Sequence, residues 1–394
     1  MNDLRTPRPR SSSRDDRYGR SSRGDGRRGF PSLWLGASVA GLTALGLVLG
    51  TLDGSAPTPS ALATNDAGTI ATVPATTPDP AAASAAAITT APAPTTTAPI
   101  EPVLVAGASI PPLADMISRV GGGRVEVVSV VPQGVDGHTY EPTPSDVADI
   151  TRADVTFFAS EDLNPSVTRT VEANLAPGAL TVDLLEVTVP EEEVILDNVH
   201  SHGDEVHGHA NVHVWTDPTI AQRWVQAIGV YLGELDPAGA DVYTANANDL
   251  AAKIAALHDA TIAATATVPD QFRTLVVYHD SWSYFGRTYG YEVLGALQAA
   301  DFAEPSAAEV ANMVEEVRAA GVPAFFGAAV FPVEVLERVS EEAGVPYVAD
   351  LADDELPGQP GDPEYGYLGM MVDNVRHIVT SLGGDASALD GVQL

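Results

Sequence analysis

The sequence predicts an α/β protein built from two Rossmann-like α/β lobes that are joined by a long rigid connecting helix. Two observations carry this prediction. From about residue 102 onward, short apolar runs alternate with helical patterns, as is typical of parallel sheets with helices on both faces. One segment, Ala238–Ala266, interrupts the alternation: it has no strand signal and is rich in Ala, Leu and Ile at helical spacing.

Each element follows from its local pattern. Apolar runs bounded by turn-forming residues are predicted as buried strands: Val103–Ser109, Arg124–Val131, Val155–Ala159, Leu180–Leu185, Thr274–Tyr278, Ala324–Val330 and Tyr347–Asp350. Helical spacing predicts the helices between them: Pro112–Val120, Pro144–Arg152, Ala307–Ala320, Pro332–Ala343 and Tyr367–Leu382.

Composition divides the 394 residues into six segments. These are a basic cytoplasmic segment (1–29), an apolar signal-peptide core or membrane anchor (30–52), an Ala/Thr/Pro-rich disordered linker (53–101), an N-terminal α/β lobe (102–236), the connecting helix (237–267) and a C-terminal α/β lobe (268–394).

The N-terminal segments indicate export. Nine arginines precede the apolar run, which keeps the N-terminus inside and sends the rest of the chain outward. Arg27-Arg28 resembles a twin-arginine signal, and Ala61–Ala63 resembles a cleavage site, but an uncleaved anchor explains the long apolar run equally well. Both alternatives predict an extracytoplasmic protein, either secreted or anchored at the membrane.

Charge and cysteine content restrict the ligands. The formal net charge is -33, so the protein repels nucleic acid phosphates and attracts cations. The chain has no cysteine, which excludes disulfides, thiolate metal sites and a lipid-modified cysteine. Any metal must therefore be held by His, Asp and Glu side chains.

Four candidate ligands lie at or just after predicted strands or before a helix. They are His138, His213, His279 and Asp350. Ligands bind outside the carboxyl ends of strands in open α/β sheets, so these side chains can converge on a cleft between the lobes. Imidazoles with one carboxylate suit Zn²⁺, whereas Mn²⁺ prefers more oxygen ligands.

Several motifs resemble the zinc/manganese-binding receptors of ABC importers. They are Gly107–Asp115, His138–Asp146, His213–Pro218, His279-Asp280 with Tyr284-Phe285, Glu304–Ser306 and Tyr367–Asn374. The resemblance covers the chain from about Val103 to the C-terminus. It implies a binding protein that captures Zn²⁺ and delivers it to an ABC permease without catalysis, with the four residues above as ligands. We expect it to act as a monomer.

Two further features bear on the metal. Manganese-type receptors carry Glu where this chain has His279, so the resemblance favours zinc. A His-rich loop at 199–210 resembles the mobile loop of zinc receptors; it is expected to lack stable structure and to bind Zn²⁺ weakly through His200, His202, His207 and His209.

The chain also departs from the family pattern. Gln133-Gly-Val-Asp-Gly137 stands where the family usually has Pro-Gly-Ala-Asp-Pro. The sequence after Asp350 is atypical, so Asp353 or Asp354 could replace it as the fourth ligand. Asp217, before Pro218, is either a helix cap or a hydrogen-bond partner of a ligand imidazole.

Three alternatives remain open. The protein could be a manganese receptor of the same family. It could be a zinc hydrolase if the carboxylate does not bind, because catalytic zinc keeps an open position. It could also be a surface adhesion or scaffold protein that a metal stabilises.

Overall fold

The structure, a computed structural model, describes residues 101–202, 205–294, 305–328, 330 and 333–394. The predictions for 1–29, 30–52 and nearly all of 53–101 lie outside these residues. Within the described ranges, no helix combines the length and apolarity needed to cross a membrane.

The N-terminal half, residues 101–236, contains a parallel sheet of four strands in the order β2-β1-β3-β4. The strands are β1 (Leu104–Ala108), β2 (Val125–Ser129), β3 (Val155–Phe158) and β4 (Leu180–Asp183). The helices that follow them are α1 (Pro111–Gly121), α2 (Pro144–Ile150), α3 (Pro165–Asn174), α4 (Leu184–Thr188) and α5 (Pro218–Leu235). Because β1 pairs with both β2 and β3, the loops leaving β1 and β3 diverge at one sheet edge, where such folds bind ligands.

The C-terminal half, residues 268–394, repeats this arrangement with shorter strands. They are β7 (Thr274–Val276), β8 (Glu292–Leu294), β9 (Phe325–Phe326) and β10 (Tyr347–Val348), with helices α7 (Ser283–Tyr289), α8 (Ala307–Ala320), α9 (Val333–Ala343) and α10 (Tyr367–Ser381). β7 pairs with β8 and β9 with β10, all in parallel, and a bridge from Val277 to Phe326 joins the two pairs. The resulting order, β8-β7-β9-β10, matches that of the first half.

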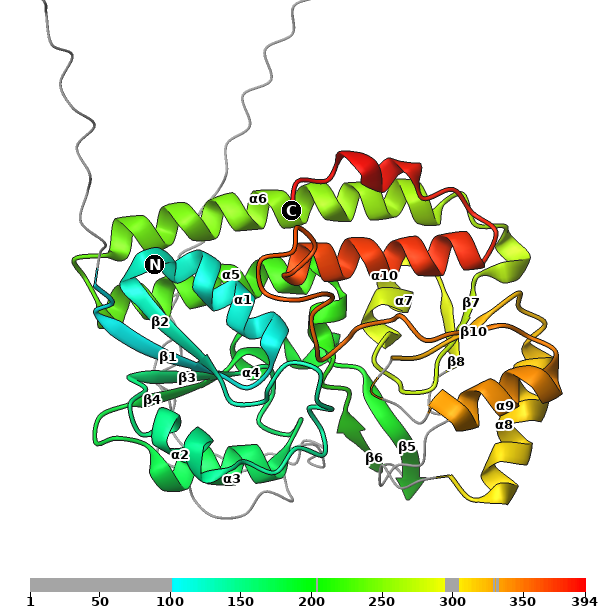
Figure 1. The fold of residues 1–394 in the computed structure, drawn as a ribbon, viewed down its shortest axis with the longest axis horizontal. Coiled ribbons are helices and arrows are strands. Elements are labelled where there is room, and N and C mark those ends of the chain that lie inside the picture. The colour runs from blue at the N-terminus through cyan, green and yellow to red at the C-terminus, as the bar shows by residue number, and fades with distance from the viewer. Residues whose placement is uncertain (1–100, 203–204, 295–304, 329, 331–332) are drawn as a thin grey trace, which may run out of the picture. The chain divides into compact units, whose positions relative to one another are not determined.

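Helix α6 (Ala240–Thr265) occupies the segment predicted as the connecting helix. Figure 1 shows it as the long helix at the top of the view, running past both halves, with α5 and α10 beneath it. It packs on α1, α5 and α10 and buries Tyr243, Leu250, Ile254 and Leu257. The largest hydrophobic cluster contains buried residues of both halves, and each half also has a smaller cluster of its own. The α/β fold class is therefore confirmed.

Local sequence signals explain where several helices begin. Thr143 and Asp146 form a capping box at α2, and the Asn164 side chain accepts hydrogen bonds from two amides of α3. Asp217 accepts from the Thr219 amide at 2.8 Å, so it caps α5, and its second oxygen accepts from Thr288 at 2.6 Å. Its role is thus that of a cap rather than a partner of a ligand imidazole.

The His-rich segment differs from the expectation of an unstructured loop. It forms an antiparallel hairpin of β5 (Leu196–His202) and β6 (Glu205–Ala210). The base of the hairpin is anchored because the Tyr284 hydroxyl donates to Asn211 O and accepts from Ile195 N, both at 3.0 Å. Asn211 N also donates to Ile195 O at 2.8 Å. These tertiary contacts have no local signature in the histidine-rich sequence.

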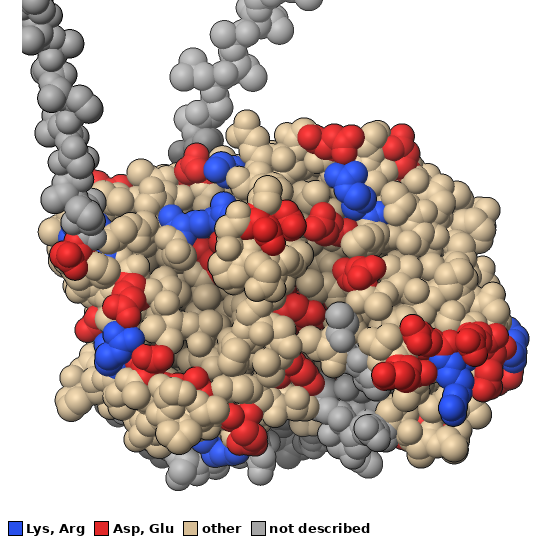
Figure 2. Space-filling model, in the orientation of Figure 1, with Lys and Arg blue, Asp and Glu red and all other residues tan. Residues whose placement is uncertain are grey.

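Acidic side chains are distributed over the surface (Figure 2). Figure 2 shows them spread over the visible face, with a dense group over α8 and α9. Those helices carry Glu309, Glu315, Glu316, Glu334, Glu337, Glu341 and Glu342. The distribution agrees with a surface that attracts cations and repels polyanions.

Candidate metal centre

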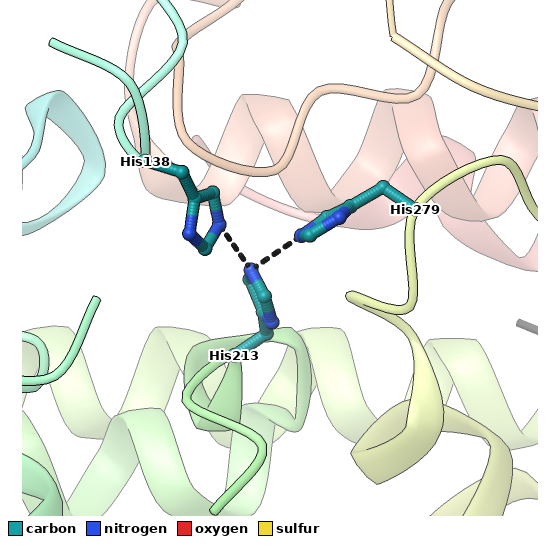
Figure 3. Close-up of side chains that lie close together, drawn as sticks. All are labelled: His138, His213 and His279. Carbon is teal, nitrogen blue, oxygen red and sulfur yellow. Dashed lines mark hydrogen bonds between the residues drawn. The ribbon is translucent and has the colours of Figure 1, made fainter. Parts of the chain in front are cut away.

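Three imidazoles from distant parts of the chain converge at one point (Figure 3). His138 follows β2, His213 precedes α5, and His279 follows β7. His213 Nε2 lies 2.9 Å from Nε2 of His138 and 2.9 Å from Nε2 of His279. Ligand atoms of all three lie within 4.8 Å of one another, and they form the one group of metal-ligating residues among those that the structure describes.

The hydrogen bonds of Nδ1 determine which ring nitrogen of His138 and of His213 is available to a metal ion. His138 Nδ1 donates to the carbonyl oxygen of Leu163 at 3.1 Å, and His213 Nδ1 donates to Asn211 Oδ1 at 3.2 Å. With the proton on Nδ1, each neutral ring directs its Nε2 lone pair toward the shared point. A divalent cation satisfies these lone pairs at once, and tetrahedral ligands at 2.0–2.1 Å are about 3.3 Å apart, close to the observed spacing.

Burial keeps these imidazoles neutral. It lowers the pKa of His138 to about 3, with a smaller contribution from His279. The pKa of His213 lies well below its ordinary value because the ring is buried and close to His279 and His138. Neutral imidazole is the form that binds metal, so both rings are ready to act as ligands near neutral pH.

A buried carboxylate lies beside one member of the group, His138. Asp354, in the loop after β10, is 3% exposed, and its Oδ2 lies 3.7 Å from His138 Nε2. Burial raises its pKa well above the ordinary value, and the neighbouring Asp353 and Glu355 raise it further. Its Oδ1 has no hydrogen-bond partner among the described residues. An unsatisfied buried oxygen is costly, and a cation at the imidazole cluster would relieve that cost.

Asp350, the fourth ligand suggested by sequence, does not join this cluster. It is solvent-exposed and lies two residues after the end of β10. Leu351 N then donates to Gly327 O at 3.0 Å, so the chain still runs beside the residue that follows β9 at this point and reaches Asp354 only later. The structure therefore places Asp354 beside His138 and Asp353 in a pocket lined by His279, whereas Asp350 is exposed.

The remaining histidines lie elsewhere. His200, His202 and His207 are on the β5–β6 hairpin, and His209 is exposed on β6. His258, on α6, bonds the Tyr289 hydroxyl through Nδ1 at 2.8 Å, which is a packing role.

Asn211 was not recognised from sequence as a site residue. Its Oδ1 accepts from both the backbone amide (3.0 Å) and Nδ1 of His213, and its Nδ2 donates to the Asp280 carbonyl at 2.8 Å. The Asn-x-His spacing is an available signal, because an Asn side chain commonly bonds the backbone two residues on.

The depressed pKa of His138 predicts a loss of stability in acid. Between about pH 6.5 and 3 the unfolded imidazole binds a proton that the folded one does not, so the free energy of unfolding falls as pH falls. The slope is about 1.4 kcal/mol per pH unit for one histidine. Urea unfolding of metal-free protein at pH 7 to 4 should show a shallower acid loss for His138→Gln than for the parent. Equal slopes would contradict the assignment; carboxylates such as Asp183 contribute equally to both proteins.

The comparisons with known proteins identify the family of the chain. The sequence profile of the family described as zinc-uptake complex component A, periplasmic, matches residues 107–381. The chain belongs to this family. The manganese-binding lipoprotein MntA of Halalkalibacterium halodurans is 28% identical over 270 residues, which cover 68% of this chain and 85% of that protein. The iron-binding protein YfeA of Yersinia pestis is 26% identical over 269 residues, covering 67% and 82%.

Solved structures show the same fold. The periplasmic zinc-binding protein TroA from Treponema pallidum superposes with a TM-score of 0.63 at 24% identity, covering 71% of this chain and 99% of that one. A crystal structure of ZnuA gives a TM-score of 0.60 at 23% identity, covering 71% and 99%.

Membership of the family establishes the general function. The chain is the metal-binding, substrate-binding component of an ABC metal importer and not an enzyme. The zinc-hydrolase and scaffold alternatives are thereby set aside. The cargo is a divalent metal ion, and the relatives are named for manganese, iron and zinc.

Proposed function

We propose that this receptor captures Zn²⁺ through His138, His213, His279 and Asp354, and delivers it to its ABC permease. The observation that carries the proposal is the convergence of three imidazole nitrogens beside one buried carboxylate. Three nitrogens and one oxygen suit tetrahedral Zn²⁺, whereas Mn²⁺ favours a site richer in oxygen. Mn²⁺ is the alternative cargo, because relatives are named for it.

His279→Glu tests the choice of metal. The substitution exchanges a nitrogen ligand for a carboxylate, so we expect affinity to shift from Zn²⁺ toward Mn²⁺ by at least about tenfold in the ratio of dissociation constants. The measurement is competitive titration of the purified, metal-stripped protein with both ions, alongside the parent. A parent that binds Mn²⁺ as tightly as Zn²⁺, or a variant with an unchanged ratio, would favour the manganese alternative.

The β5–β6 hairpin is proposed as an auxiliary zinc site. Its register pairs His200 with His207 and His202 with Glu205, so these positions face one another across the two strands. We expect the double variant His200→Gln/His207→Gln to lose the weaker zinc equivalents and keep the tight one. The number of zinc ions bound per protein, measured by elemental analysis after dialysis, tests this expectation. Ser201→Ala, at a position of the same hairpin that pairs with Val206, is the matched control.

The organisation around the receptor follows from this role. We propose that residues 102–236 and 268–394 act as two lobes, with 237–267 as the helix between them, in a monomer that works outside the cytoplasm. Segment 30–52 either anchors the chain in the membrane or is removed with a signal peptide. Protease accessibility on intact cells and N-terminal sequencing of the mature protein separate these two cases.

A further inference from the structure

The loop that carries Asp354 leaves its own half of the molecule. Up to Ala352 it is held by the C-terminal half: Asn374 accepts from Ala352 N at 2.9 Å and donates to Ala352 O at 2.6 Å. Three of the next four residues, Asp353, Asp354 and Leu356, are bound by groups of the N-terminal half. The Trp215 indole nitrogen donates to Asp353 O at 2.9 Å, and the Gly137 amide donates to the Asp354 carboxylate.

Gln133 makes the third of these attachments. Its Oε1 accepts from Leu356 N at 3.0 Å, and its Nε2 donates to Leu356 O. A side-chain amide that pairs with both groups of one backbone residue fixes the position of that residue in two directions. Gln133 lies in the loop after β2, only five residues before His138, so it connects the loop of one metal ligand to the loop of another.

The acidic side chains of residues 353–355 oppose the position of this loop against the N-terminal half. Asp353, Asp354 and Glu355 are consecutive and all buried. Asp354 Oδ1 and Glu355 Oε2 have no hydrogen-bond partner among the described residues, so burying these groups in this position is costly. Without a cation these carboxyl groups disfavour the docked position. Attachments that do not involve the carboxylates, such as the Gln133 amide, must therefore counteract this tendency.

We propose that Gln133 is a positioning residue: a latch between the two halves that keeps Asp354 at the metal cluster and so slows metal release. This inference rests on the proposed ligand role of Asp354. A ligand held in place by a latch stays near the ion after a single coordinate bond breaks and can rebind, whereas an unlatched one withdraws. The latch thus acts chiefly on dissociation of the metal rather than on its association.

The test compares metal dissociation rates of the full protein, measured by stopped-flow chase of bound Zn²⁺ into a chromophoric chelator. Gln133→Leu removes both hydrogen bonds at similar volume, and we expect about tenfold faster dissociation with association changed less than twofold. Gln133→Glu, which keeps an acceptor for Leu356 N but loses the donor, should fall between parent and Gln133→Leu. Gln359→Leu, at an exposed position of the same loop, is the control and should match the parent.

A double-mutant cycle separates positioning from general stability. If Gln133 acts through Asp354, its effect on dissociation disappears in an Asp354→Asn background. An equal acceleration in both backgrounds overturns the latch in favour of a structural role. Asp354→Asn that accelerates release while Gln133→Leu does not overturns the latch alone. An Asp354→Asn protein that releases Zn²⁺ like the parent overturns the proposed ligand set, and the latch with it.

Discussion

Asp354→Asn is expected to weaken Zn²⁺ binding about a hundredfold, whereas Asp350→Asn leaves it unchanged. Four-ligand structural zinc sites bind with about 10–16 kcal/mol, so one ligand accounts for roughly 3 kcal/mol, which corresponds to about two orders of magnitude in the dissociation constant. Asp354 is buried 3.7 Å from His138 Nε2, and Asp350 is exposed. Competition with a chelator of known affinity measures both variants on the same scale.

The metal-free stability of Asp354→Asn gives an independent check. In the parent, Asp354 is buried beside Asp353 and Glu355, and burial disfavours its charged form. Asparagine keeps the shape and removes the acid, so the midpoint of thermal unfolding without metal should stay the same or rise. The rise in the unfolding midpoint on addition of Zn²⁺ should be smaller than in the parent, because the size of this rise depends on the affinity for Zn²⁺. A lower metal-free midpoint with unchanged zinc affinity would show that Asp354 serves the fold rather than the metal.

Gly137→Ala is the second substitution with a large expected effect. A Cβ at this position would lie 2.6 Å from Asp354 Oδ2 and 3.2 Å from its Cγ. The carboxylate must then move away from the cluster, while the backbone amide that bonds it is retained. We expect a ten- to hundredfold loss of zinc affinity, the size seen when groups that orient metal ligands are changed, with little loss of stability because the displaced atoms end a side chain.

The control for that substitution is Gly391→Ala, where an added Cβ meets nothing within 4 Å. Isothermal titration of both proteins with Zn²⁺, together with thermal unfolding without metal, separates affinity from stability. Parent-like affinity in Gly137→Ala would mean that Asp354 has room to move without leaving the ion, which contradicts the close fit of the loop after β2 against the loop after β10.

Much of the fold follows from local pattern. The predicted strand runs all contain strands of the structure, and the segment without a strand signal is α6. Apolar periodicity and capping residues act over a few positions, so they can be recognised without tertiary knowledge. Helices α3, α4 and α7 and strands β5, β6 and β8 have no counterpart among the predicted ranges, and α5 was expected only as a helix after His213.

The same contrast between local pattern and tertiary contacts applies to the histidines of the site and to the hairpin. His138, His213 and His279 could be named in advance because each lies at or just beyond a strand end or directly before a helix, in a recognisable motif. The hairpin at 199–210 could not be predicted from its own sequence, because the hydroxyl of Tyr284, far along the chain, holds its base.

The sequence by itself determined the α/β class, the three imidazoles and the chemistry of a site without thiolates. Only the tertiary structure decided which aspartate lies beside His138. Asp350 and Asp354 lie in one acidic stretch, and nothing local distinguishes a strand-end carboxylate that faces solvent from one that the next turn buries. That difference is set by Gln133, Gly137 and Trp215, which bind residues 353–356 from the other half of the molecule. Contacts between residues so distant in sequence exist only once both halves have folded and packed together.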